Sequence, residues 1–344
     1  MSKAASADHL KVDPDLPVSP EGVTYHVKCK SDELADRILL VGDPGRVKDV
    51  AEFFDAGSVR FHSENREIYI STGTYQGTPV SVVSTGMGTD NVEIVINEIY
   101  VLKEYDFVRR GWRPRAGDAH VPQGAQVFDP STVKLIRVGT CGSPFPDMSL
   151  GALAVTRYVI GMDNTCLLYK ANEQVKKSKD LLEVQRVVKA RTGLGGIDVY
   201  TTKAHPAITN GIVAACKSFN EHLSAGAKKQ EYVVGTTATA SGFYGCQGRA
   251  VGRFREHLLV PNLVEELSKL EFDVTEGKEI VANIEMETSA LCSLSNMLGY
   301  QAGSVCVVVA KRAGAEHLFA THEQGKVALA NAIRIALNAI VGIP

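Results

Sequence analysis

A layered α/β fold is predicted by the alternation of short β-rich runs with amphipathic helical patterns along the 344-residue chain. The β-rich runs are bounded by Gly, Pro or polar turn residues, and several are apolar throughout, as in strands that are buried on both faces. In chain order they cover residues 38–41, 68–75, 80–84, 135–138, 232–237 and 305–309.

Helical patterns lie between these runs. After Asp90, apolar residues recur at positions 92, 95, 99 and 102, which is the spacing of one helix face. The same spacing predicts a C-terminal helix over 327–340. Helices are also expected over 47–54 and 288–298, where each follows a strand and a turn-forming or acidic motif.

The composition indicates an ordinary globular protein, with 44% hydrophobic and 22% charged residues. A formal net charge of -2 provides no basic field, so neither nucleic acid nor an anionic membrane is expected as a partner. A small molecule is the expected partner. The first 20 residues lack a signal-peptide core, and no apolar run approaches the length of a membrane span. Seven cysteines without a CxxC pair fit a reducing, cytoplasmic location.

Residues 107–130 interrupt the pattern with four arginines, three prolines and three glycines. Turn formers and charged residues cannot fill a core, so a surface insertion is expected near 107–130. The chain is therefore divided into a flexible N-terminal arm over 1–24 and a single domain over 25–344.

The loop over 243–249 combines an aromatic ring, a carboxamide and a guanidinium in Phe243, Gln247 and Arg249. A flat heterocycle with alternating carbonyl and N–H groups, such as uracil, requires a ring to stack on and donors and acceptors at its edge. The alternative is that Phe243 is a core residue and the two polar residues are solvated.

Two segments are candidates for binding an anion. Gly42 to Arg46 link a strand to a helix, where backbone N–H groups and Arg46 could face phosphate; a plain turn with a surface arginine is the alternative. Arg137 lies in an apolar strand that is expected to run into a glycine-rich turn over 139–142, with Thr140 as a hydroxyl donor. A buried arginine is costly unless it is paired, which implies a bound anion or a carboxylate partner.

Two carboxylates flank a methionine at 285–287, where a strand leads into a helix. Negative charge is favourable at a helix start, which could explain both glutamates. Together with a base loop and anion sites, Met286 and Glu287 suggest a ribose clamp, because a carboxylate can accept from two vicinal hydroxyls.

In this order and at these separations, the motifs GDPxR at 42–46, RxGT at 137–140, FYxxQxR at 243–249 and EME at 285–287 resemble the nucleoside phosphorylase family, which includes uridine phosphorylase and the hexameric bacterial purine nucleoside phosphorylases. The resemblance implies a three-layer α/β/α sandwich around a central mixed, partly barrel-like β-sheet. The Gln-x-Arg pair is typical of the uridine enzymes. It implies a pentosyltransferase that converts uridine and the co-substrate phosphate to uracil and ribose 1-phosphate in pyrimidine salvage, with no other cofactor required.

The resemblance also assigns roles by motif. Phosphate would be held by Gly42, Arg46, Arg137, Thr140 and Arg66, the last lent by a neighbouring subunit. Ribose would be held by Thr140, Met286, Glu287 and a neighbour's His26, unless His26 is an ordinary surface residue. Uracil would be held by Phe243, Gln247 and Arg249.

Further expectations follow from the family. A structural cation, K⁺ or Ca²⁺, would lie at the dimer interface near Glu67, the Met87 carbonyl and Asn91, with an interface hydrogen bond as the alternative. Either Lys311 or Arg312 would assist at the base, in place of the acidic residue of the purine enzymes. The sites need at least a homodimer, and the insertion could block a hexamer. The competing functions are a purine nucleoside phosphorylase and a nucleosidase of the same fold.

Overall fold

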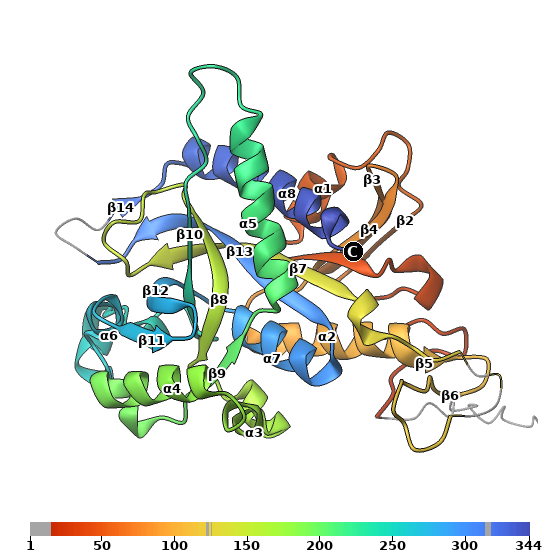
Figure 1. The fold of residues 1–344 in the computed structure, drawn as a ribbon, viewed down its shortest axis with the longest axis horizontal. Helices are drawn as coiled ribbons and strands as arrows, with labels where there is room; N and C mark the ends of the chain where they lie inside the picture. The colour runs from red at the N-terminus through yellow and green to blue at the C-terminus, as the bar shows by residue number, and fades with distance from the viewer. Residues whose placement is uncertain (1–14, 122–123, 125, 314–317) are drawn as a thin grey trace, which may run out of the picture.

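The computed structural model confirms the α/β class (Figure 1). It describes residues 15–121, 124, 126–313 and 318–344. The main strands are β1 (Arg37–Val41), β2 (Phe61–Asn65), β3 (Ile68–Tyr75), β4 (Thr78–Ser84), β7 (Lys134–Ser143), β8 (Leu153–Gly161), β9 (Tyr200–Lys203), β10 (Tyr232–Thr239), β11 (Glu271–Val274), β12 (Gly277–Glu285), β13 (Gln301–Lys311) and β14 (Leu318–Phe319).

The helices over 45–51, 89–104, 288–298 and 322–342 lie close to where the sequence predicted helices, whereas those over 171–175, 179–191, 206–221 and 263–268 were not predicted. In chain order the helices are α1 (Gly45–Ala51), α2 (Thr89–Glu104), α3 (Ala171–Val175), α4 (Lys179–Arg191), α5 (Pro206–Glu221), α6 (Leu263–Ser268), α7 (Thr288–Leu298) and α8 (His322–Gly342). The predicted helix over 288–298 coincides with α7, whose C-cap Gly299 adopts a left-handed conformation with φ of 75°.

The strands form one mixed, twelve-stranded sheet in the order β11-β12-β10-β8-β13-β7-β1-β4-β3-β2, with β9 beside β8 and β14 beside β13. An additional antiparallel pairing joins Ile284 of β12 to Gly142 of β7. Strands β7, β13, β8, β10 and β12 therefore form a closed ring, which is the barrel-like part of the sheet. Ring closure brings the ends of β7 and β12 together, although about 140 residues separate them in the chain.

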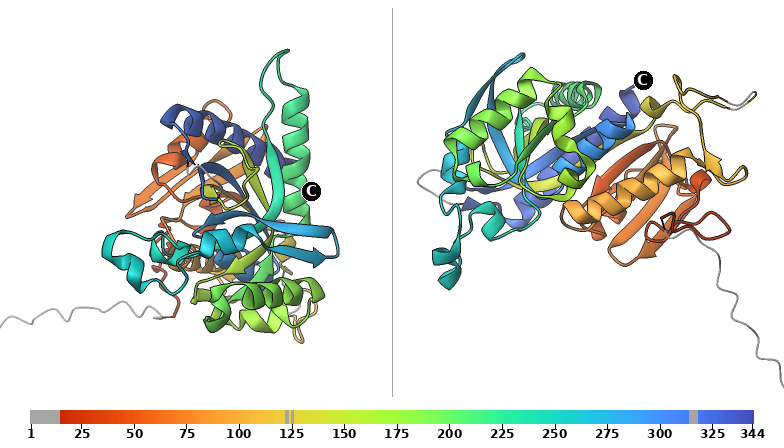
Figure 2. Two further views of the ribbon diagram at one scale, coloured as in Figure 1. Left: turned by 90° about the vertical axis from the view of Figure 1, so that its left-hand side faces the viewer. Right: turned by 90° about the horizontal axis from the view of Figure 1, so that it is seen from below.

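The sheet is covered on both faces. Alternate residues of β1 point to opposite sides. Leu39 and Val41 pack in a buried cluster with residues of α1, α5 and α8. Ile38 and Leu40 pack in a second cluster with residues of α2 and α7. Figures 1 and 2 show these two groups of helices on opposite sides of the sheet, which confirms the three-layer arrangement.

Within the described residues, α8 is long and apolar enough by composition to cross a membrane. Its apolar residues are nevertheless part of the core, since Ala332, Ile333, Ala336 and Ile340 are at most 1% exposed and pack against strands of the sheet. The helix therefore closes one face of the sandwich.

The insertion near 107–130 is attached to the body by an ion pair and a stacked aromatic pair. It starts with a hairpin of β5 (Tyr105–Asp106) and β6 (Gly111–Trp112), and the ring of Trp112 stacks on Tyr100 at 4.6 Å. Arg115 Nε donates to the buried carboxylate of Glu104 at 2.7 Å. Of the arm over 1–24, residues 1–14 lie outside the described part, and Val18 bridges Thr24 in the remainder.

Candidate active site

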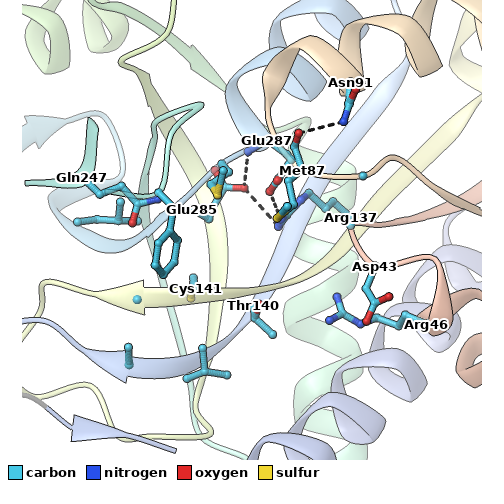
Figure 3. Close-up of a pocket in the computed structure, with 18 of the residues that line it drawn as sticks. Asp43, Arg46, Met87, Asn91, Arg137, Thr140, Cys141, Gln247, Glu285 and Glu287 are labelled. Carbon is cyan, nitrogen blue, oxygen red and sulfur yellow. Dashed lines mark hydrogen bonds and ion pairs between the residues drawn. The ribbon is translucent and has the colours of Figure 1, made fainter. Parts of the chain in front are cut away.

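A cavity of about 740 Å³ opens at the ends of β1, β7 and β12. Figure 3 shows Gln247 on one side of it and Arg46 on the other, with Glu287 and Arg137 between them. Of the predicted site residues, twelve line the cavity: Gly42, Arg46, Glu67, Met87, Asn91, Arg137, Thr140, Phe243, Gln247, Arg249, Met286 and Glu287. His26 and Arg66 do not.

Residues 139–142 are the second half of β7, so the predicted glycine-rich turn is wrong. The strand continues to Ser143 because it pairs in parallel with β13 along its whole length. Gly139 is needed for another reason, since a Cβ there would lie 2.0 Å from Nη1 of Arg137. The glycine makes room for the guanidinium and does not change the chain direction.

Arg137 is 5% exposed and lies between two carboxylates. Its Nη1 is 3.3 Å from Oε2 of Glu285, and its Nη2 pairs with Glu287. Burial works against its charge, but the carboxylates of Glu287 and Glu285 keep the pKa of Arg137 above its usual value. The sequence left open whether Arg137 pairs with a bound anion or with a carboxylate. In the structure it pairs with the carboxylates of Glu285 and Glu287.

Glu287 lies two residues after the end of β12 and is the N-cap residue of α7. Its Oε1 accepts from the backbone N–H of Gly88 at 2.9 Å. Burial raises the pKa of Glu287, and the charge of Arg137 opposes this shift. Glu285 fixes the junction by accepting from the Glu287 N–H at 3.0 Å and from Thr239 Oγ1 at 2.6 Å.

In the loop after β1, the donor available to an anion is the side chain of Arg46, because two of the backbone N–H groups are already hydrogen-bonded. The N–H of Gly45 donates to Oδ1 of Asp43 at 2.9 Å, and that of Arg46 donates to the Asp43 carbonyl at 3.1 Å. The guanidinium of Arg46 donates from Nη1 to the Val138 carbonyl at 3.3 Å, and its buried Nε has no partner within the described residues. Burial lowers the pKa of Arg46, and the nearby charge of Arg137 adds to this effect.

The base loop includes a short 3₁₀ turn, η5 (Gly245–Gln247). Gln247 is 3% exposed, so the alternative of a solvated amide does not hold. The guanidinium of Arg249 lies 4.0 Å from the ring centroid of Phe243, and its Nε donates to the Phe243 carbonyl at 2.9 Å. Phe243 is 44% exposed and belongs to the cavity wall, not to the core.

Arg312, not Lys311, contacts the base loop. Its Nη2 donates to the backbone carbonyl of Gln247 at 3.0 Å, while Lys311 pairs with Leu318 in the strand ladder. Gly142 leaves space for it, since a Cβ there would lie 2.9 Å from Cγ of Arg312. Burial and then the charge of Arg249 lower the pKa of Arg312 to about 10.

His26 and Arg66 lie close together outside the cavity. The backbone N–H of His26 donates to Oε1 of Glu98 at 2.9 Å, and its Nδ1 lies 2.7 Å from the same oxygen. Asn65 Nδ2 donates to the His26 carbonyl at 2.9 Å. The neighbouring Arg66 is exposed, and its guanidinium lies 5.9 Å from the ring of Tyr25.

The three predicted cation ligands line one part of the cavity wall. Asn91 Nδ2 donates to the Met87 carbonyl at 3.1 Å. Among the described residues, no group of three His, Cys, Asp or Glu residues could hold a metal. Hard cations are bound by several oxygens, and these three residues supply only a carboxylate, a carbonyl and an amide from one chain.

Sequence reasoning assigned no role to several residues that lie in or beside the site. Asp43 and Phe319 line the cavity, and Cys306 accepts a hydrogen bond from Arg137. Only Asp43 had a local signal, because Asp before Pro-Gly is a common turn former. Cys306 and Phe319 reach the site through the pairing of β13 with β7 and β14, which no local motif encodes.

The chain is similar to known proteins over nearly its whole length. The family described as Phosphorylase superfamily matches residues 36–341. A uridine phosphorylase of Thermococcus kodakarensis is 28% identical over 96% of this chain and 90% of its own length. A DeoD-type purine nucleoside phosphorylase of Oceanobacillus iheyensis is 36% identical, but over only 37% of this chain and 43% of its own length.

Solved structures extend the comparison. The crystal structure of a Trypanosoma brucei nucleoside phosphorylase, which shows uridine phosphorylase activity, is 58% identical, with a TM-score of 0.93 over 95% of this chain and all of that one. A uridine phosphorylase structure from Phytophthora capsici covers 96% of this chain and 97% of its own, with a TM-score of 0.65. At 22% identity, that second likeness shows the fold alone.

Proposed function

Because the chain belongs to the phosphorylase superfamily, we propose that it is a pentosyltransferase that converts uridine and inorganic phosphate to uracil and ribose 1-phosphate. One observation carries this proposal: donors suited to a pyrimidine edge face arginines suited to phosphate across a single cavity, with a carboxylate between them. The likeness to the Trypanosoma brucei and Thermococcus kodakarensis proteins supports the choice of nucleoside.

On one side of the cavity, phosphate is held by Gly42, Arg46, Arg137 and Thr140. The Nε of Arg46 has no partner among the residues that the structure describes, and the Thr140 side chain is exposed toward the cavity. On the ribose side, Glu287 accepts from the two hydroxyls while Met286 packs against the sugar.

At the other side, uracil packs on Phe243. The amide of Gln247 takes the N3 and O2 edge, and Arg249 takes O4. Arg312 donates to the backbone of Gln247 and holds the amide in place. The same arginine adds positive charge where the purine enzymes carry an acid.

The reaction breaks the bond between C1′ and N1 and forms a bond between C1′ and a phosphate oxygen. The pair of electrons leaves with uracil, and the negative charge spreads from N1 to O2 and O4. Gln247, Arg249 and Arg312 stabilise this charge, while Arg46 and Arg137 hold the attacking anion near the cationic ribose. Catalysis is then mainly electrostatic placement, which needs no covalent nucleophile.

A homodimer completes the site in this proposal. His26 and Arg66 lie together on an exposed region and do not line their own chain's cavity, so they are suited to reach a partner's 5′-hydroxyl and phosphate. Arg66→Ala and Glu287→Ala subunits, each inactive alone, should regain activity when mixed, because a mixed dimer has one intact site. Mixtures that stay inactive would refute the shared site.

The structural cation remains part of the proposal. Two copies of Glu67, the Met87 carbonyl and Asn91 would supply six oxygens, a number typical of Ca²⁺ sites. In that state the Asn91 amide would turn its oxygen toward the ion. Removal of the ion, by chelation of Ca²⁺ or by exchange into buffer without K⁺, should then lower the dimer's thermal stability, and the ion added back should restore it.

The test is the release of free base from uridine, thymidine, inosine and adenosine, each with and without phosphate. We expect uridine to be cleaved only with phosphate, in a cytoplasmic pyrimidine salvage reaction. Faster cleavage of inosine or adenosine would favour the purine alternative, which the partial match to DeoD-type relatives supports. Cleavage without phosphate would indicate a nucleosidase.

A further inference from the structure

Cys306 lies under the anion-binding arginine and takes no part in the reaction as described above. It is fully buried on β13, in register with Gly139 of β7, while Ser304 is in register with Arg137. Partners in register on adjacent strands share a face of the sheet, and residues two apart share that face as well. Arg137, Gly139, Ser304 and Cys306 therefore form one patch on the inner side of the ring.

The guanidinium of Arg137 extends along this patch toward Cys306. It occupies the space above Gly139, where a Cβ would lie 2.0 Å from Nη1. From there Nη1 donates to Sγ of Cys306 at 2.9 Å. Ser304 Oγ lies 3.4 Å from the same sulfur and packs beside the contact. The sulfur of Cys306 is thus an acceptor at the end of the arginine.

The other contacts of Arg137 are made to acidic groups that the substrates engage or adjoin. Nη2 pairs with Glu287, which binds ribose in the proposed function, so that contact must change when nucleoside and phosphate enter. The contact to Cys306 involves no substrate group and can persist throughout the reaction. A buried acceptor at this position fixes the direction of the guanidinium.

We propose that Cys306 is a positioning residue that holds Arg137 in the orientation that binds phosphate. This role rests on the proposed function for its link to catalysis, but its direct consequence is the affinity for the anion. Cys306 is not a nucleophile in this role, and it neither touches a substrate nor exchanges a proton with one.

The experiment is calorimetric titration of the whole enzyme with inorganic phosphate, without nucleoside, followed by steady-state kinetics. Cys306→Ala removes the acceptor and should weaken phosphate binding by about five- to tenfold, the scale of one typical hydrogen bond. The KM for phosphate should rise similarly, while the KM for uridine should change less than about twofold. Cys306→Ser retains an acceptor and should recover most of the lost affinity.

Cys216→Ala is the matched control, because Cys216 is also fully buried but lies on α5 within an apolar cluster. It should lower thermal stability about as much as Cys306→Ala and leave phosphate binding unchanged. If Cys306→Ala binds phosphate like Cys216→Ala, or if Cys306→Ser is no better than Cys306→Ala, the positioning role is wrong. A wild-type protein that binds phosphate but does not cleave uridine would instead overturn the proposed reaction and leave the role of Cys306 in place.

Discussion

Replacing Glu287 with glutamine should change the binding of the two proposed substrates in opposite directions. In the structure the carboxylate pairs with Nη2 of Arg137, so it occupies the group that is expected to bind phosphate. The same carboxylate is the expected acceptor for the ribose hydroxyls. Glutamine has nearly the same shape but no charge, so it separates these two effects.

The magnitude follows from the charges around Arg137. The two charges that repel are phosphate bound at Arg137 and the carboxylate of Glu287. Two unit charges about 6 Å apart, at an effective dielectric constant of about 20, interact by about 3 kcal/mol. The Glu285 carboxylate stays in place at 3.3 Å from Arg137, and the new amide oxygen still accepts from Nη2, so only part of this repulsion is relieved. We expect phosphate to bind about tenfold more tightly to Glu287→Gln, which corresponds to about 1.4 kcal/mol. In Glu287→Gln the ribose hydroxyls of uridine no longer have a charged acceptor, which should lower kcat/KM for uridine by about 10- to 100-fold.

Isothermal titration with phosphate and initial-rate kinetics with varied uridine measure the two effects separately. Glu265→Gln is the control, since that glutamate is exposed and pairs with an exposed lysine on the same helix. Weaker or unchanged phosphate binding in Glu287→Gln would refute the reasoning, because it would mean that Glu287 does not compete for Arg137.

Three other predictions concern the base loop, pH and the insertion. Arg249→Ala should lower kcat for uridine by about 100-fold or more, as for other preorganised donors, while Arg253→Ala, in the 3₁₀ turn over 252–257 outside the cavity lining, should not; equal rates would contradict the base assignment. Burial raises the pKa of Glu279 to about 7 from 4.5. Between these two pH values the carboxyl of Glu279 is therefore protonated in the folded protein and ionised in the unfolded chain. Unfolding free energy should therefore fall by up to about 3 kcal/mol as pH rises from 4.5 to 7, and Glu279→Gln should remove this slope in urea titrations. Arg115→Ala leaves the buried Glu104 carboxylate without its cation and should lower the urea-unfolding free energy by about 3 kcal/mol; a loss below about 1 kcal/mol would mean that the insertion is not anchored there.

The features that the sequence predicted well are those encoded within a few consecutive residues. The apolar spacing after Asp90 predicts α2, and the acidic junction before Thr288 predicts α7, because helix faces and starts are local properties. The motif residues converge on one cavity because the motif at 137–140 lies in the second half of β7 and the other motifs lie at or after the ends of strands in the same sheet. That meeting of strand ends follows from the fold class.

The features that the sequence did not predict depend on partners far away in the chain. Glycines at 139 and 142 suggested a turn, but their role is to leave space for the side chains of Arg137 and Arg312. The choice of Arg312 over Lys311 depends on which residue β14 pairs with. Cys306 reaches the site only through the register of β13 with β7. None of these relations has a local signature, because each is set by strand pairing.

The buried charges of the cavity are best explained as substrate-binding groups that pair with each other when no substrate is bound. A buried ion pair such as that of Arg137 with Glu287 is often no more stable than two apolar side chains of the same size, so its presence is weak evidence for a structural role. Each member, however, keeps the other charged until a substrate group replaces it. Phosphate can take the place of the carboxylate beside Arg137, and a diol can take the place of the guanidinium beside Glu287. Phosphate binding then frees Glu287 for the nucleoside, and nucleoside binding frees Arg137 for phosphate. The two substrates should therefore favour each other's binding without any change of fold.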